Sequence, residues 1–255
     1  MLIDTHAHLT DSAFNEDREE VVKRAKENMV KNIITSGFNL LSSLEAVEFC
    51  RNHDGVFASV GVYPENINEL TDDEMSKLAL LIDDEKVVAI GEIGLQYADD
   101  MPDKNAQKAG FLKQIKLAYD KKKPIVIHCR EAYGDTLEIL KENRKFLTYG
   151  GTMHCFGGSE EVAKELIKLG LYISVGGVST FKNAVRLREV IRSVPLERII
   201  LETDCPYLTP TPFRGKRNSP EYIPLIAENL AQIKGVSVEE VARVTTENAR
   251  RLFKI

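Results

Sequence analysis

The stretch LIDTHAHLT, residues 2–10, joins a short apolar run to two histidines that stand two residues apart. Side chains at positions i and i+2 of an extended strand point to the same side, so the rings of His6 and His8 can meet one ion. We expect Leu2 to Thr5 to form the first strand, with both histidines at its carboxyl end. The rest of the chain repeats this arrangement of strand and polar end, and the repetition decides the fold.

Short β-type runs alternate with longer amphipathic runs along the whole chain, which is typical of parallel strands joined by right-handed crossovers. The expected strands are Leu2 to Thr5, Asn32 to Ser36, Val56 to Val62, Val87 to Glu92, Pro124 to His128, Gly151 to His154, Leu171 to Val175 and Arg198 to Asp204. The expected helices include Glu16 to Lys31, Lys104 to Lys122, Ala132 to Asn143, Glu160 to Leu169, Asn183 to Arg192, Pro224 to Lys234 and Ser237 to Leu252. We expect the last two helices to pack on the outside.

Bulk composition agrees with one closed barrel. The chain has 255 residues, is 43% hydrophobic and carries no linker rich in Gly, Pro or Ser. We therefore predict an α/β fold, a (β/α)8 TIM barrel that forms a single domain over residues 1–255. The formal net charge of -5 argues against a protein that coats nucleic acid by bulk electrostatics. Bound cations or a local basic loop can still reverse the field at a site.

Cysteine usage and hydropathy bear on the compartment. The four cysteines form no C-x-x-C pair and no framework typical of disulfides, which favours a reducing compartment. No apolar run approaches the ~20 residues of a membrane span. Cleavage of an N-terminal leader would remove His6 and His8 themselves. We expect a cytoplasmic protein with no membrane partner, and the sequence leaves its oligomeric state open.

Ligand-type side chains stand at or just after the carboxyl ends of the expected strands, where TIM barrels place their active sites. The predicted metal ligands are His6, His8, Glu92, His128, His154 and Asp204. His53 is the exception among the five histidines, because it lies near a helix end, and we expect it to be exposed or to cap that helix. Six such groups facing one mouth would be costly without cations, and two cations suit them better than one.

Six motifs follow one another along nearly the whole chain: DTHAH (Asp4 to His8), GEIGL (Gly91 to Leu95), IHCR (Ile127 to Arg130), HCF (His154 to Phe156), ETDCPYL (Glu202 to Leu208) and RGKRNSP (Arg214 to Pro220). In these motifs and their order the chain resembles TatD-type deoxyribonucleases, a family of metal-dependent hydrolases with a TIM barrel. The resemblance implies one metal held by His6, His8, Glu92 and Asp204. It implies a second held by Glu92, His128 and His154.

Glu92 and Asp204 are the predicted catalytic residues. Glu92 would bridge the metals, since a carboxylate has two oxygens and can span cations ~3.5 to 4 Å apart. Asp204 would orient or deprotonate an attacking water that the metals make acidic. Strand alternation gives Asp4 the parity of His6 and gives Glu202 the parity of Asp204. We expect Asp4 and Glu202 to lie beneath the metals and to orient the ligands by hydrogen bonds.

Several residues near the expected mouth are candidate substrate contacts. Arg130 lies two residues beyond His128, so it points the same way and can grip a phosphate. Three basic residues follow the eighth strand in a loop with Gly and Pro, a place to meet a nucleic-acid backbone, although a solvated surface loop is the alternative: Arg214, Lys216 and Arg217. Tyr63 and Gln96 depart from the family pattern, which usually has histidine and aspartate at these positions. Both are expected near the substrate.

The leading hypothesis is hydrolysis of DNA phosphodiester bonds, as an exonuclease or a nuclease acting on single-stranded or frayed ends, which the resemblance implies. The cofactors would be two divalent cations, Zn, Mn, Mg, Fe or Co, and the sequence does not choose among them. An amidohydrolase-type enzyme that cleaves C-N or ester bonds of a small substrate is the alternative, because its fold and H-x-H start are similar. A metal-binding scaffold without activity is the third reading, supported only by Tyr63 and Gln96.

Overall fold

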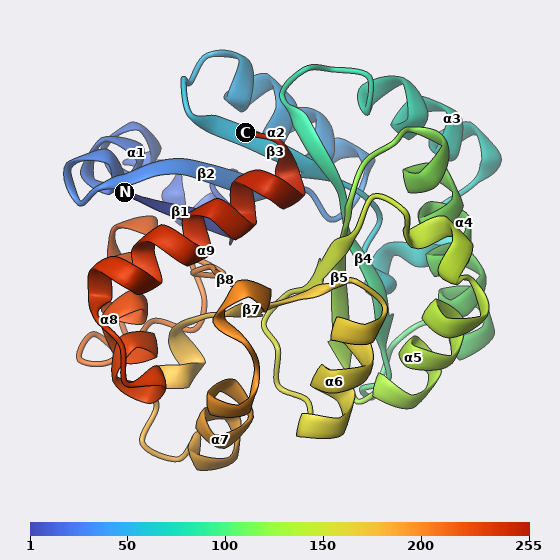
Figure 1. Cartoon of the computed structure of the whole chain (residues 1–255). Helices are drawn as coiled ribbons and strands as arrows, with labels where there is room; N and C mark the ends of the chain where they lie inside the picture. The colour runs from blue at the N-terminus through green and yellow to red at the C-terminus, as the bar shows by residue number, and fades with distance from the viewer.

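Eight parallel strands form one sheet, in the same order as they occur along the chain (Figure 1). The computed structural model describes all residues from Met1 to Ile255. The strands are β1 (Leu2–Ala7), β2 (Val30–Ser36), β3 (Val56–Val60), β4 (Val87–Gln96), β5 (Ile125–Arg130), β6 (Gly151–Met153), β7 (Tyr172–Val175) and β8 (Ile199–Leu201). The sheet returns on itself, since the Thr5 hydroxyl donates to the Leu201 carbonyl at 2.9 Å. The predicted (β/α)8 barrel is confirmed.

Helices follow the strands in alternation and lie around the sheet (Figure 1). They are α1 (Arg18–Glu27), α2 (Leu40–Arg51), α3 (Asp72–Leu81), α4 (Lys104–Asp120), α5 (Tyr133–Glu142), α6 (Glu160–Lys168), α7 (Val185–Ser193), α8 (Ile223–Lys234) and α9 (Val238–Phe253). Six short 3-10 helices lie between them, at Ser12–Phe14, Pro64–Glu69, Arg144–Leu147, Gly177–Thr180, Leu196–Arg198 and Pro220–Tyr222. No helix is both long and apolar enough to cross a membrane.

Local signals explain where several helices begin and end. The side chains of Ser159 and Ser237 accept from backbone amides in the first turns of α6 and α9, which satisfies donors that the helix itself leaves free. Gly235 ends α8 with φ 68°, a left-handed conformation that glycine adopts without a steric cost. The first helix begins later than expected, at Arg18 after the cap residue Asp17, because Asn15 ends a 3-10 turn instead.

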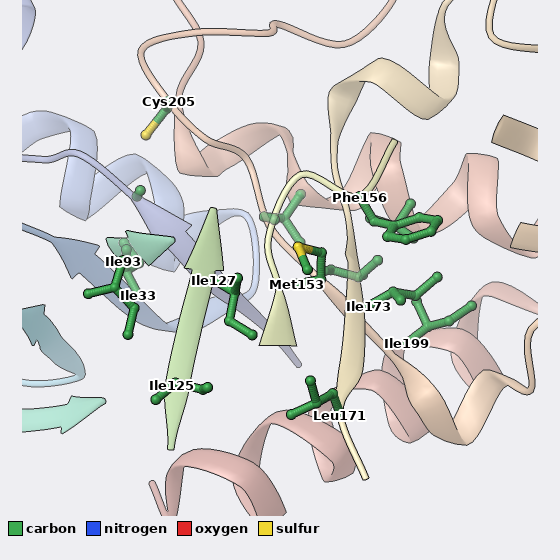
Figure 2. Close-up of a cluster of buried hydrophobic side chains, with 14 of the residues drawn as sticks. Ile33, Ile93, Ile125, Ile127, Met153, Phe156, Leu171, Ile173, Ile199 and Cys205 are labelled. Carbon is green, nitrogen blue, oxygen red and sulfur yellow. The ribbon is translucent and has the colours of Figure 1, made fainter. Parts of the chain in front are cut away.

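The main core is the layer between the strands and the surrounding helices. It contains 49 buried hydrophobic residues contributed by all eight strands and by helices from α1 to α9. Figure 2 shows a part of this layer, with Ile173 of β7, Ile199 of β8 and Phe156 close together. Full burial of one such side chain stabilises the fold by about 1.5–3 kcal/mol. This layer fixes the strands, and thereby the side chains at their carboxyl ends.

Helix α9 covers the amino-terminal end of the barrel. A second core of 10 buried residues joins Ala249, Leu252 and Phe253 of α9 to side chains from the strands. The Asn248 amide donates to the carbonyl of Ile199, the first residue of β8, at 2.8 Å. The expectation that both final helices pack on the outside is wrong for α9, because its apolar face closes the barrel end opposite the polar strand ends.

Candidate metal centre

The carboxyl ends of five strands bring the six predicted ligands together. His6, Glu92 and His128 lie within β1, β4 and β5, which extend further than the sequence indicated, and His8 follows β1. His154 and Asp204 come after the ends of β6 and β8. Asp204 has φ 58°, a left-handed conformation that is sparsely populated for residues other than glycine. The chain therefore leaves the β8 direction at the residue whose carboxylate faces the site.

His6 and His8 form one half of the cluster. Their Nε2 atoms lie 3.2 Å apart. Glu92 Oε2 is 3.3 Å from Nε2 of His6 and 3.7 Å from Nε2 of His8. Asp204 Oδ1 is 3.6 Å and 3.4 Å from the same two atoms. Two ring nitrogens and two carboxylate oxygens thus converge from β1, β4 and the end of β8, as the spacing of the two histidines predicted.

His128 and His154 form the other half and face the second oxygen of Glu92. Oε1 of this carboxylate lies 2.8 Å from Nδ1 of His128 and 2.9 Å from Nε2 of His154. These two ring nitrogens are 3.1 Å apart. Glu92 therefore presents one oxygen to each pair of histidines. This is the arrangement a bridging carboxylate needs.

Burial and charge act against each other within the cluster. Burial disfavours the charged form of Glu92, but the charge of His154 and hydrogen bonds from His128 and His154 hold the pKa of Glu92 well below its ordinary value. Burial also disfavours protonation of His154, yet Glu92 raises the pKa of His154 to about 10. Burial, with His154 beside it, lowers the pKa of His6 to about 4. Without cations, a proton shared by the cluster offsets part of the carboxylate charge.

The donor set fits divalent cations. The ligand atoms of His6, His8 and Glu92 lie within 4.8 Å of one another, and those of Glu92, His128 and His154 do so as well. The second carboxylate, Asp204, keeps a pKa below its ordinary value, since bonding to His8 outweighs the cost of burial. Imidazole nitrogens with carboxylate oxygens suit Zn, Mn, Fe or Co. A cation would replace the proton held at His154 and supply the positive charge.

Hydrogen bonds behind the rings determine which nitrogen faces the cluster. His8 donates from Nδ1 to the Ser36 carbonyl at 3.1 Å, so Nε2 is the ring nitrogen that faces the cluster and could bind a cation. Nδ1 of His6 is 3.1 Å from Ser36 Oγ, and that hydroxyl bonds Ser59 Oγ at 2.8 Å. Sequence reasoning missed Ser36 and Ser59. Their only signal was that both polar residues end or nearly end a buried strand.

Asp4 is completely buried and bonds the chain rather than a ligand ring. Oδ1 accepts from the amide of Thr203 at 2.9 Å and from the amide of His6 at 3.3 Å, and Oδ2 accepts from the Thr203 hydroxyl at 2.6 Å. Burial raises the pKa of Asp4 to about 7. Asp4 thus ties β1 to the segment after β8, and it acts on the ligands through their backbone.

Glu202 lies beneath His154, also completely buried. One oxygen accepts from the backbone amide of Cys155, the other has no partner, and Nδ1 of His154 also lacks one. Glu202 Oε1 and His154 Nδ1 are 3.9 Å apart, too far for the expected hydrogen bond. Burial raises the pKa of Glu202 to about 7. The structure therefore places Glu202 next to the ligand without a direct bond.

A pocket of about 640 Å³ opens over the cluster, a size suited to small ligands or one end of a polymer. Arg130, Tyr63 and Gln96 line it, as expected of substrate contacts. Phe38 and Tyr207 line it too and are 41% and 54% exposed, which leaves apolar rings free at the rim. Sequence reasoning did not single out Phe38. His6 lies below the pocket wall, fully buried.

The basic loop after β8 does not line this pocket. Arg217 donates to both carboxylate oxygens of Asp17, at 2.8 and 2.6 Å, and its guanidinium lies over the Phe14 ring. The guanidinium of Arg214 lies 4.3 Å from the centre of the Phe181 ring, and Lys216 lies near Phe213. The structure thus gives Arg217 a partner within the protein, and the loop stands beside the pocket.

His53 lies outside the cluster, at the helix end where the sequence placed it. Its Nδ1 is 2.7 Å from the carbonyl of Phe49 in α2, and its Nε2 is 2.6 Å from Glu19 of α1. It therefore joins two helices at the surface. The four cysteines are all free, in agreement with the expected absence of disulfides.

Comparison with known proteins finds relatives that match this chain in sequence and in fold. Residues 3–254 match a family model described as TatD related DNase. A Bacillus subtilis protein named uncharacterized metal-dependent hydrolase YabD is 46% identical over 255 residues, covering 100% of both chains. A Cronobacter sakazakii protein named 3'-5' ssDNA/RNA exonuclease TatD is 33% identical, covering 99% of this chain and 97% of that protein. The crystal structure of YJJV, a TatD homolog from Escherichia coli, superposes with a TM-score of 0.94 at 30% identity, covering 100% of this chain and 98% of the other.

Proposed function

Because the chain belongs to the TatD-related DNase family of metal-dependent hydrolases, we propose that it hydrolyses phosphodiester bonds of DNA at single-stranded or frayed ends, as an exonuclease. The observation that carries this proposal is Glu92, whose two oxygens each face a separate pair of histidine nitrogens. That arrangement supports a centre of two cations. The relative named as a 3'-5' ssDNA/RNA exonuclease supports a nucleic-acid substrate.

His6, His8, Glu92 and Asp204 would hold one cation, and Glu92, His128 and His154 would hold the other. Bound divalent cations supply two things, a water acidic enough to attack at neutral pH and positive charge beside the phosphate oxygens. The protein contributes the geometry. The ring nitrogens and Glu92 are already directed at one another before any substrate arrives, so little reorganisation is needed.

Asp204 is the proposed proton acceptor. Its Oδ1 faces the rings of His6 and His8, so its other oxygen is left to take a proton from the attacking water. Its lowered pKa keeps it ionised at neutral pH, as an acceptor requires. The side chain is 14% exposed and lines the pocket, which gives water a route to it.

Arg130 is the proposed anchor for a phosphate. Arg130 lies two residues after His128 in β5, so alternation along the strand turns both side chains to the same side. It lines the pocket and is exposed. A guanidinium can donate two parallel hydrogen bonds to phosphate oxygens. Tyr63 and Gln96 line the wall beside it. We propose that Arg214 and Lys216 meet the nucleic-acid backbone further from the cleaved bond, with Arg217 holding their loop. We also propose that residues 1–255 act as one domain, and a cytoplasmic location stays a prediction.

A cleavage assay tests the proposal. Single-stranded DNA labelled at either end is incubated with protein stripped by EDTA and reloaded with Mn²⁺, Mg²⁺ or Zn²⁺, and the products are resolved by length. Stepwise shortening from one end is expected only after reloading, and His128→Ala should abolish it. Leu80→Ala, far from the pocket on an exposed face of α3, is the matched control. Cleavage by the stripped protein, or turnover of amides but not of DNA, would contradict the proposal.

A further inference from the structure

Tyr63, Gln96 and His128 form a closed triangle of polar atoms at the edge of the pocket. The Tyr63 hydroxyl is 2.6 Å from Gln96 Oε1 and 3.0 Å from His128 Nε2. Gln96 Oε1 is 2.9 Å from the same Nε2. The three residues come from the turn after β3, the end of β4 and the end of β5. Tyr63 and Gln96 thus contact each other and one predicted metal ligand, His128.

The protons of this triangle can be assigned by counting. His128 turns Nδ1 to Glu92 and His154, so a cation-binding ring needs its lone pair there and its hydrogen on Nε2. That hydrogen points to Gln96 Oε1. The Tyr63 hydroxyl donates to the same oxygen, because an amide carbonyl has two lone pairs and accepts both. When Nδ1 of His128 faces the cluster, the Nε2 hydrogen of His128 and the Tyr63 hydroxyl therefore both have Gln96 Oε1 as their acceptor.

The Gln96 backbone is held independently of its side chain. Its amide donates to Gln107 Oε1 at 2.9 Å, and Gln107 Nε2 donates back to its carbonyl at 2.9 Å. Gln107 is completely buried, and Gln96 is 7% exposed. The side-chain amide nitrogen has only the sulfur of Met101, at 3.2 Å, as a partner. Substituting the side chain therefore removes the acceptor and leaves the strand end in place.

We propose that Gln96, oriented by Tyr63, is a positioning residue. It keeps the hydrogen of His128 on Nε2, so that Nδ1 can bind a cation. Because its acceptor is a neutral amide, it also sets a weak affinity for the cation held by Glu92, His128 and His154. This inference rests on the proposed function, because it presumes that two cations bind. An acceptor behind a metal-bound histidine raises the basicity of that ring, and an ionised acceptor does so more strongly than an amide. The rings of His6 and His8 also have neutral partners, but their side of the cluster has a second carboxylate, Asp204, so its cation would bind more tightly.

The test measures cation affinity and not turnover. Full-length protein is stripped with EDTA, and Zn²⁺ is titrated against a chromophoric chelator to resolve two binding steps. Gln96→Leu removes the acceptor and should weaken the second step by about 10- to 100-fold, the usual effect of losing such a partner. Gln96→Glu should tighten it by about 10-fold on the same grounds. Tyr63→Phe keeps the ring and should weaken it less than Gln96→Leu. The first step should stay within about 2-fold in all three.

Asn66→Asp is the matched control, because it adds a carboxylate to the pocket wall at a side chain whose hydrogen bond is to Glu69. It should leave the second step unchanged. Proton-detected ¹⁵N spectra of the Zn²⁺-loaded protein provide a second measurement. The Nε2 hydrogen of His128 should be visible in the wild type, shift further downfield in Gln96→Glu and exchange away in Gln96→Leu.

The outcomes separate the two levels of inference. Failure of the wild type to bind any cation would overturn the proposed function. Two normal binding steps that are equally tight in Gln96→Leu, wild type and Gln96→Glu would leave that function standing and overturn the role of Gln96. So would a Zn²⁺-loaded His128 that carries its hydrogen on Nδ1. Unfolding of Gln96→Leu is detected by its melting curve, and Gln96→Glu and the wild-type spectra then decide the matter.

Discussion

An added methyl group at Gly94 would disturb the candidate metal centre, because it would displace the backbone of His128. It lies in β4 opposite His128 of β5. A Cβ atom at Gly94 would come 1.9 Å from the carbonyl oxygen of His128, whereas carbon atoms of real side chains do not approach below 3.0 Å. In Gly94→Ala the two strands must therefore separate by about 1 Å at the residue that carries the ligand ring. A displacement of about 1 Å at a reacting geometry costs about 10²-fold in rate.

The stability cost follows from the same contact. Overpacking costs about 1–3 kcal/mol. Gly94 has φ 148°, which side chains rarely adopt, and such strain costs a further ~1–3 kcal/mol. A total of about 3 kcal/mol would lower the melting temperature by about 6–12 °C in a chain of this size. We expect Gly94→Ala to melt earlier, to lose the cation on the His128 side and to fall about 100-fold in kcat/KM.

Three measurements on one preparation check this expectation: thermal melting by circular dichroism, Zn²⁺ content after dialysis, and kcat/KM on a chromogenic phosphodiester. Gly134→Ala is the matched control. Gly134 lies in the first turn of α5, and an added Cβ would meet nothing within 4 Å. Its helix should gain up to about 1 kcal/mol, with Zn²⁺ content and rate unchanged. If Gly94→Ala had the melting temperature, Zn²⁺ content and rate of the wild type, the packing of β4 on β5 described above would be refuted.

Four further perturbations address the tie between strands, the cations and the two arginines. Asp4→Ala removes the acceptor of three buried donors, the amides of Thr203 and His6 and the Thr203 hydroxyl. At ~1 kcal/mol for each donor, the melting temperature should fall by about 6–12 °C. Equal melting of Asp4→Ala and wild type would contradict this expectation. EDTA should lower the melting temperature and excess Zn²⁺ should restore it. A ligand at 100 times its Kd stabilises a protein by ~2.7 kcal/mol, which corresponds to about 5–11 °C in a chain of this size. Arg130→Ala should raise KM for DNA by about 10-fold, the loss of one charged contact. Arg217→Ala removes the ion pair with Asp17 that holds the basic loop, so it should lower stability and raise KM less than Arg130→Ala does. A larger rise in KM for Arg217→Ala than for Arg130→Ala would contradict these roles.

The meeting of the six predicted metal ligands could be expected from the sequence because it depends on two general rules. Alternation along a strand puts His6 and His8 on one side, and parallel strands carry their carboxyl ends to one edge. The first rule acts within one strand, and the second follows from the parallel order of the strands, so the sequence predicts which side chains share the mouth. The rules tolerate small errors as well. Strands β1, β4 and β5 run two to four residues further than expected, and the ligands still face the same mouth.

The supporting contacts were not predictable in this way, because they depend on which individual atoms lie nearest to one another across neighbouring segments. Asp4 bonds Thr203, 199 residues away, and Ser36 reaches His6 across 30. The expected role of Asp4 as a partner of a ligand ring followed from parity alone. Parity specifies a side of the strand, but it does not specify whether a backbone amide or a ring is nearer. Similarly, the sequence indicated a helix over Ser237 to Leu252 packed on the outside, and its place against the end of the barrel depends on contacts with several strands.

Tyr63 and Gln96 are separate in the sequence, and only the structure shows that they contact each other. Taken singly, each was a reason to question the substrate. In the fold they make one hydrogen-bonded unit, since Tyr63 donates to the oxygen that also accepts from His128. Changing only one of them would leave a buried donor or acceptor without its partner, at a cost of about 1–3 kcal/mol. The two residues therefore form one feature of the candidate metal centre, because both contact His128, and we expect a change in either to act first on the proposed cation at His128.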